Sequence, residues 1–156
     1  MFKIKKILPI IFILMILSNC GFTPRYALNK NVNFTIDLVN ISGDREFNNF
    51  LKSRLTRYDD DNKINKKNYQ LNLESTFSKN VKSKDSTGSA LEYEIKISVK
   101  TIVKEESMET KKLVFEETFT MKKIDDAFDE ENYEKSIKEN FSDNISDKII
   151  FYLFKL

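Results

Sequence analysis

The chain has 156 residues, of which 40% are hydrophobic and 32% are charged, which indicates a single globular domain. The net charge is +2, and without the three lysines among the first six residues the basic count falls from 26 to 23, against 24 acids, so an extended nucleic-acid-binding surface is not expected. There is no His and only one Cys, which excludes His-based nucleophile pairs, most zinc sites and an internal disulfide.

The first nineteen residues have the pattern of a secretory signal. A positive segment with Lys3, Lys5 and Lys6 precedes an apolar stretch of eleven residues, Ile7 to Leu17. A signal-peptide core has about 7–15 apolar residues, whereas a membrane-spanning helix needs about 20. An uncleaved membrane anchor is the alternative, and the length of the stretch disfavours it.

The only cysteine, Cys20, directly follows this segment. Leu17-Ser18-Asn19-Cys20 resembles a bacterial lipobox, although Asn19 stands where Gly or Ala is usual. An unmodified Cys in a signal or anchor is the alternative. After cleavage, Cys20 would carry covalent lipid, and two or more acyl chains give stable membrane anchoring. We expect no other cofactor. The expected organisation is a lipoprotein signal peptide, a lipidated N-terminus with a linker, and one α/β domain: residues 1–19, 20–32 and 33–156.

The domain begins with a strand and a helix. Apolar and polar residues alternate over 32–38, which predicts a half-buried strand. Ser42-Gly43-Asp44 ends it, and Asp44 can cap a helix whose apolar residues recur with helical spacing over 47–58. Residues 58–68 are polar and loop-like. Their acidic cluster, Asp59 to Asn62, lacks the spacing of a calcium loop, so we expect no metal site.

Three further strands follow, with alternating apolar residues over 69–77, 91–103 and 113–121. A hairpin tip over 82–89, with Gly88 as the turn residue, joins the first two of these strands. Glu117 falls out of phase on the apolar side of the last strand, which suggests a β-bulge there.

A long helix over 129–156 completes the chain, because apolar residues recur about every four positions. The predicted fold class is α+β with element order β-α-β-β-β-α. It comprises a four-stranded, mostly antiparallel sheet with two helices packed on one face. The other face of the sheet is polar and is left for solvent or a partner.

The sequence offers little that could support catalysis. It has only three Gly, no phosphate-binding glycine loop and no carboxylate pair marked as acid and base, so an enzyme is not expected. The remaining candidates are lysines that could contact phosphate as point charges. They are Lys79, Lys82 and Lys84 beside the hairpin tip, and Lys111 and Lys112 at the start of the last strand. Ordinary solvated lysines, or protection of an edge strand, are the alternative.

Four segments carry a family resemblance. The stretch Cys20-Gly21-Phe22-Thr23-Pro24-Arg25-Tyr26 is similar to the C-G-F-x-P-L-Y sequence that opens the mature proteins of one lipoprotein family. Arg45 stands at the start of the first predicted helix, as an Arg does in that family. Tyr69-Gln70-Leu71 is similar to the Y-x-L that opens its second strand, and Ile145 to Leu153 to its L-A-x-x-I-x-x-x-L helix. With these segments in the same order, the chain resembles the LPS-assembly lipoprotein family, LptE.

The resemblance implies a lipoprotein on the periplasmic side of the outer membrane. Such a protein plugs the β-barrel LptD, helps the barrel to assemble and assists insertion of lipopolysaccharide, to which the lysines above would contribute charge. The expected partners are therefore LptD, lipopolysaccharide and, through lipid, the membrane, but not nucleic acid. The alternative is another periplasm-facing lipoprotein that binds a partner, either a small-ligand carrier or a pilotin-like chaperone of a secretion pore.

Overall fold

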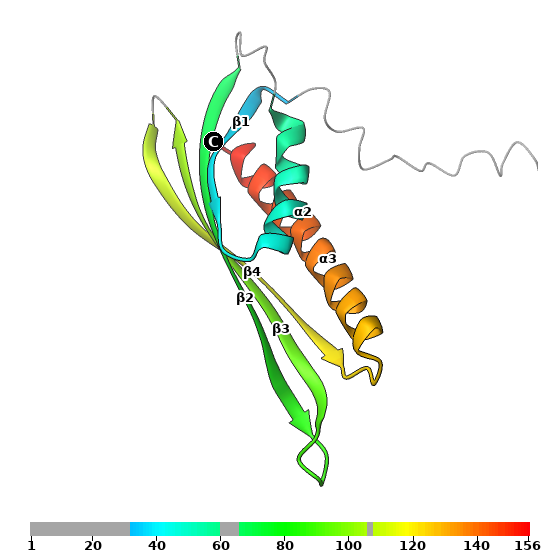
Figure 1. Ribbon diagram of the computed structural model, residues 1–156. Helices are drawn as coiled ribbons and strands as arrows, with labels where there is room; N and C mark the ends of the chain where they lie inside the picture. The colour runs from blue at the N-terminus through cyan, green and yellow to red at the C-terminus, as the bar shows by residue number, and fades with distance from the viewer. Residues whose placement is uncertain (1–31, 60–65, 106–107) are drawn as a thin grey trace, which may run out of the picture. The chain divides into compact units, whose positions relative to one another are not determined.

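The computed structural model describes residues 32–59, 66–105 and 108–156. The element order is β-α-β-β-β-α, as predicted, with a short 3₁₀ turn after the first helix (Figure 1). The elements are β1 (Phe34–Ser42), α2 (Arg45–Leu55), η2 (Thr56–Tyr58), β2 (Lys67–Lys84), β3 (Ala90–Glu105), β4 (Met108–Lys122) and α3 (Ala127–Leu153). The predictions for residues 1–31, including the signal segment and Cys20, lie outside the described residues.

The four strands form one sheet in the order β1-β2-β3-β4. β1 and β2 are parallel, because α2 returns the chain to the same end of the sheet before β2 begins. The other two pairs are antiparallel hairpins. The first hairpin is longer than the sequence predicts, because β2 continues through Lys84 and only Asp85 to Ser89 form the turn.

Both helices cover the same face of the sheet, and the hydrophobic core lies between them and the strands (Figure 1). Alternation directs every second residue of each strand toward the face that the helices cover. The apolar residues that recur along the predicted C-terminal helix are buried from Ile137 to Leu153, whereas Tyr133 and Phe154, which continue the same spacing at either end, are exposed. Neither described helix combines the length and apolar character that crossing a bilayer requires.

Glu117 lies on the face of β4 that the helices cover, here called the helix face. The predicted bulge at this position is wrong. The pairing of β3 with β4 runs without a shift from Glu92–Lys122 to Val103–Lys111. Instead, the Glu117 carboxylate accepts a hydrogen bond of 2.6 Å from the Lys148 ammonium on α3. The acid is tolerated on the apolar face because this charge partner comes from the helix above it.

The connection between β1 and α2 depends on a close backbone approach at Gly43. Gly43 has φ +104°, and a Cβ at this position would lie 1.8 Å from the Ser75 carbonyl oxygen of β2. The Ser75 hydroxyl accepts from the Asp44 N–H at 2.9 Å and donates to the Ser42 carbonyl at 3.3 Å. Asp44 then caps α2, as predicted, by accepting from the Phe47 N–H at 2.8 Å.

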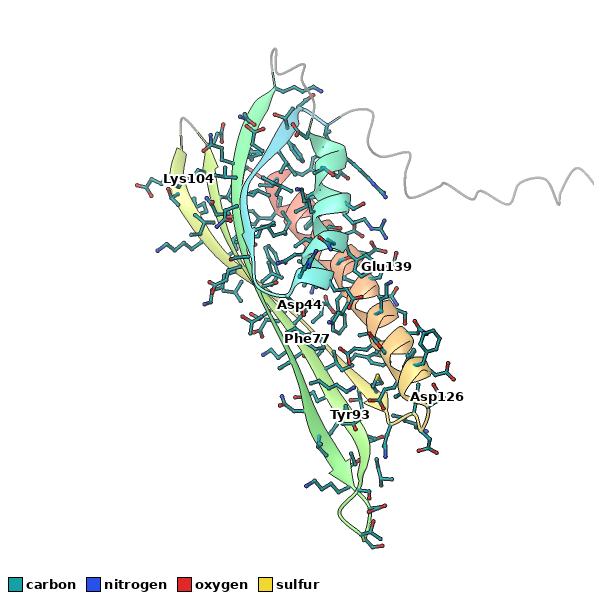
Figure 2. All side chains as sticks on the ribbon, in the orientation of Figure 1. Asp44, Phe77, Tyr93, Lys104, Asp126 and Glu139 are labelled. Atoms are coloured by element: carbon teal, nitrogen blue, oxygen red, sulfur yellow. The ribbon has the colours of Figure 1, made fainter. Side chains whose placement is uncertain are left out.

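A buried lysine joins the two helices to the sheet. The Lys138 ammonium on α3 lies 3.3 Å from Asp44, 3.4 Å from Glu46 and 3.6 Å from Glu134, and 4.1 Å from the ring centre of Phe77. Asp44 and Phe77 are labelled in Figure 2. Burial by itself would lower the pKa of Lys138, but the surrounding carboxylates outweigh burial and raise it. Lys138 is therefore a charged structural residue.

Candidate binding surface

The face of the sheet opposite the helices is the candidate binding surface, here called the open face. It carries the alternate side chains of β2, β3 and β4 that do not enter the core, and most of them are polar or charged. Two cross-strand ion pairs lie on it, Lys96–Glu116 at 3.1 Å and Lys100–Glu74 at 3.4 Å. This polar face agrees with the sequence prediction.

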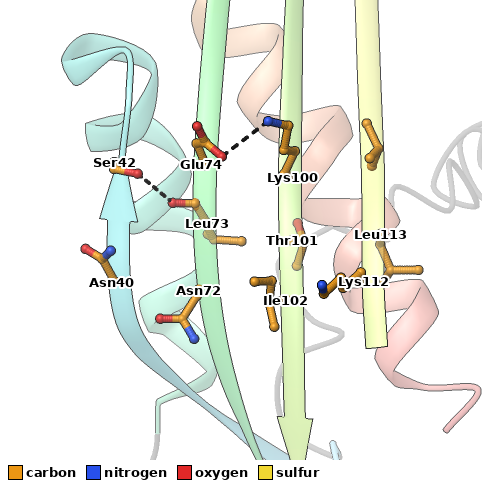
Figure 3. A pocket seen from close by; sticks show the side chains of 11 residues that line it. Asn40, Ser42, Asn72, Leu73, Glu74, Lys100, Thr101, Ile102, Lys112 and Leu113 are labelled. Atoms are coloured by element: carbon orange, nitrogen blue, oxygen red, sulfur yellow. Dashed lines mark hydrogen bonds and ion pairs between the residues drawn. The ribbon is translucent and has the colours of Figure 1, made fainter. Parts of the chain in front are cut away.

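A groove of about 480 Å³ crosses the open face at the level where all four strands are paired (Figure 3). Its polar lining includes the Asn40 and Asn72 amides and the Lys112 ammonium. Its apolar lining includes Ile102 and Val114, which stand among polar neighbours on adjacent strands, and the Val114 residue is 61% exposed.

Amide groups, a cation and aliphatic side chains occur together in this groove. The arrangement can bind an amphipathic group, with its apolar part on Ile102 and Val114 and an anionic or hydrogen-bonding part on Lys112, Asn40 and Asn72. The groove is not apparent from the sequence. In the sequence, Ile102 and Val114 are apolar residues at strand positions where the alternation otherwise places polar residues. Only the pairing of the strands shows that the two are close.

Lys79 uses its charge within the chain. It lies on the helix face of β2, where its ammonium contacts Glu130 at 2.8 Å and Glu134 at 3.1 Å and lies 4.5 Å from the ring centre of Tyr93. Burial alone would lower the pKa of Lys79, but the hydrogen bonds and charges of the two carboxylates raise it overall. The Lys79 ammonium also holds the pKa of Glu130 below its usual range. These contacts favour a structural role for Lys79.

Lys82 and Lys84 lie at the distal end of the first hairpin, and both are exposed. The Lys82 ammonium donates to the Thr120 hydroxyl at 2.6 Å. The adjacent turn is held by Asp85, whose carboxylate accepts from the Thr87 and Ser89 N–H groups at 2.8 and 2.9 Å. The hairpin end therefore presents two ammonium groups beside an ordered turn.

Lys111 and Lys112 lie at the opposite end of the sheet. Lys84 pairs with Ala90 of β3, whereas Lys111 pairs with Val103 of the same strand. At the usual rise per residue of a strand, Ala90 and Val103 lie roughly 40 Å apart along β3. Lys111 also belongs to the helix face and Lys112 to the open face. The structure therefore does not bring the five predicted lysines into one site.

No protein-family model matches the sequence, and no curated protein matches it. Among solved structures, rare lipoprotein B from Shewanella oneidensis is similar with a TM-score of 0.55 and 16% identity, over 76% of this chain and 98% of that chain. A minor lipoprotein from Acinetobacter baumannii gives a TM-score of 0.47 and 14% identity, over 70% of this chain and 91% of that chain. The likeness to rare lipoprotein B shows a shared fold.

Proposed function

We propose that this chain is a non-catalytic lipoprotein of the outer membrane, anchored on the periplasmic side through lipid on Cys20. In this proposal it plugs the barrel LptD, helps that barrel to assemble and assists insertion of lipopolysaccharide. The observation that carries the proposal is the fold shared with rare lipoprotein B, whose whole length is nearly covered and whose name states that it is a lipoprotein. The lipobox-like segment ending at Cys20 and the LptE-like opening support it independently.

The two faces of the sheet suit a plug. The helices cover one face, and the open face is polar, with paired charges and a shallow groove. The lumen of an outer-membrane barrel is itself polar, so such a face can be enclosed there without a large desolvation penalty. We propose the exposed Lys82 and Lys84 as the first phosphate contacts, since the Lys79 ammonium is already held by two carboxylates. Lys111 and Lys112 lie on opposite faces at the other end of the sheet, so they are not part of this contact.

The partner is tested by pull-down of the full chain through a C-terminal tag from detergent-solubilised membranes, with the captured proteins identified by mass. A large outer-membrane barrel is expected in near-stoichiometric amount. The Cys20→Ser variant, which cannot take the lipid, should keep its leader and capture much less barrel. Recovery of the wild-type chain alone, together with normal surface lipopolysaccharide after depletion, would contradict the proposal.

The lysine contacts are tested separately by binding of purified full chain to lipopolysaccharide. The Lys82→Ala/Lys84→Ala variant should bind roughly tenfold more weakly than wild type, because two phosphate contacts are lost. Lys52→Ala/Lys135→Ala, which removes two exposed lysines from the helices, is the matched control and should bind normally. Equal loss in both variants would indicate a general effect of charge and not a site.

The groove on the open face gives the alternative function a specific form. A small-ligand carrier or a pilotin-like chaperone would bind an amphipathic ligand or a partner peptide over Ile102 and Val114. Val114→Asp should then abolish binding of that ligand while the tagged chain still captures no barrel. Capture of the barrel by wild type and variant alike would exclude this alternative.

A further inference from the structure

The outer edge of β4 is a long strand edge with no neighbouring strand in the described structure. β4 ends the strand order, and no described strand pairs with its outer side. The strand has 15 residues, contains neither Gly nor Pro, and is apolar at its centre, where Leu113, Val114 and Phe115 follow one another. A long edge of this kind is a ready template for another strand unless charges block it.

The direction of the backbone groups follows from one hydrogen bond and the register. The Lys123 N–H donates to the Leu91 carbonyl at 2.9 Å, so residue 123 is bonded inward to β3. The pairing then continues without a shift to Val103–Lys111, and inward and outward residues alternate along an antiparallel strand. Even-numbered residues such as Lys112, Val114 and Glu116 therefore direct their N–H and C=O groups to the free edge.

The charges of this edge are arranged so that the strand complements itself. Two lysines, Lys111 and Lys112, precede the apolar centre, and two acids, Glu116 and Glu117, follow it at equal distances from Val114. We propose that two copies of this chain pair antiparallel through β4, about a two-fold axis at Val114, to form one continuous sheet. Each Lys112 then lies opposite a Glu116 and each Lys111 opposite a Glu117, on matching faces.

Neighbouring registers lack this match. With the axis at Leu113, the two lysines face apolar residues and Glu109 faces Glu117 of the other copy. With the axis at Phe115, Glu117 faces Leu113 and neither lysine faces an acid. A parallel, in-register pair would set lysine beside lysine. Opposite charges directly across a strand pair are stabilising and like charges destabilising, so the register about Val114 is favoured.

The acids already have partners within the chain, and the second copy would enlarge those contacts. Glu116 lies 3.1 Å from Lys96, and Glu117 lies 2.6 Å from Lys148. The Lys148 ammonium also donates to the Glu116 backbone carbonyl at 3.4 Å, and the Lys112 N–H of the other copy would take this place. A lysine from the other copy would add a second cation to each carboxylate. At the centre, the two exposed Val114 side chains would meet on the open face, and Leu113 would meet Phe115 on the helix face. This pairing goes beyond the proposed function, does not rest on it and concerns the chain outside a barrel.

The first test uses the symmetry of the proposed axis. In full chain purified in detergent, Val114→Cys should form a disulfide-linked dimer under mild oxidation, because residues on the axis lie about 5.5 Å apart between Cα atoms. Thr118→Cys is the matched control on the same edge and face, and should crosslink only when mixed with Thr110→Cys. The wild-type chain controls for Cys20. Equal crosslinking of Val114→Cys and Thr118→Cys alone would overturn the proposal.

The second test uses charge reversal and does not depend on an added cysteine. Lys112→Glu and Glu116→Lys each place like charges opposite one another in the homodimer, and each should weaken dimerisation roughly tenfold in sedimentation equilibrium. Mixing the two variants restores both opposite-charge pairs, so a heterodimer should form with near wild-type affinity. Absence of that rescue, or a wild-type chain that stays monomeric up to about 100 µM, would overturn the pairing.

Discussion

Replacement of Gly43 by Ala should be the most damaging single-methyl change in the described part of the chain. Gly43 has a positive φ of +104°, which L side chains rarely adopt. The added Cβ would also lie 1.8 Å from the Ser75 carbonyl oxygen and 2.7 Å from the Ser75 hydroxyl oxygen. A protein interior is close-packed, so the connection and β2 would have to separate by roughly 1 Å.

The expected cost has two parts. Holding Ala at a positive φ costs about 1–2 kcal/mol. The separation also strains the hydrogen bonds of the Ser75 hydroxyl with Asp44 and Ser42, each of which contributes about 1 kcal/mol. It displaces the cap of α2 as well, and this cap contributes about 1 kcal/mol. The free energy of unfolding should therefore fall by about 3–5 kcal/mol, a large share of the 5–15 kcal/mol typical of a domain.

Urea unfolding of the full chain, followed by far-UV circular dichroism because the chain has no Trp, measures this loss. Gly88→Ala is the matched control. Gly88 has a similar φ of +88°, but no atom lies within 4 Å of an added Cβ, so only the conformational cost of about 1–2 kcal/mol remains. If the two variants lose the same stability, the close approach of Gly43 to Ser75 adds no cost beyond the positive φ, contrary to the prediction.

Two further predictions concern the buried and half-buried lysines. Lys138→Met should lower the free energy of unfolding by about 2–4 kcal/mol, because it leaves three carboxylates without their shared cation. In the same urea assay, Lys135→Met, which changes an exposed lysine, should alter the free energy of unfolding by less than about 0.5 kcal/mol. Lys79→Met should cost about 1 kcal/mol at neutral pH. Because the pKa of Glu130 is lowered in the fold, its contribution is present above its unfolded value and is lost as pH falls through the folded value. The difference between wild type and Lys79→Met should therefore shrink below about pH 4, while Lys84→Met should show no such change; a difference that stays constant down to pH 2 would contradict the ion pair.

The sequence predicts individual elements well where side-chain periodicity is local. Alternation identified all four strands and the face of each that enters the core, and the helical spacing of Ile137 to Leu153 identified the face of α3. Asp44 was recognisable as a cap because its hydrogen bond reaches only to Phe47. These features depend on residues a few positions apart, which is why no knowledge of the sheet order was needed.

The predictions that failed or stayed incomplete depend on distant partners. Glu117 looked like a defect in the alternation, because its cation, Lys148, lies on a helix 31 residues away. Lys79 looked like a solvent-facing charge until α3 placed Glu130 and Glu134 beside it. In both cases the side chain's role follows from what packs against it, which local spacing does not specify.

The sequence by itself determined the order and amphipathic faces of the elements, since strand and helix periods are set by the backbone. Tertiary structure decided which strands are neighbours, and with that the parallel pairing of β1 with β2, the groove around Ile102 and Val114, and the free edge of β4. The physical reason is that strand pairing joins backbone groups, which are the same in every residue. Only the complete set of packed side chains selects one arrangement of strands from several with equivalent hydrogen bonding.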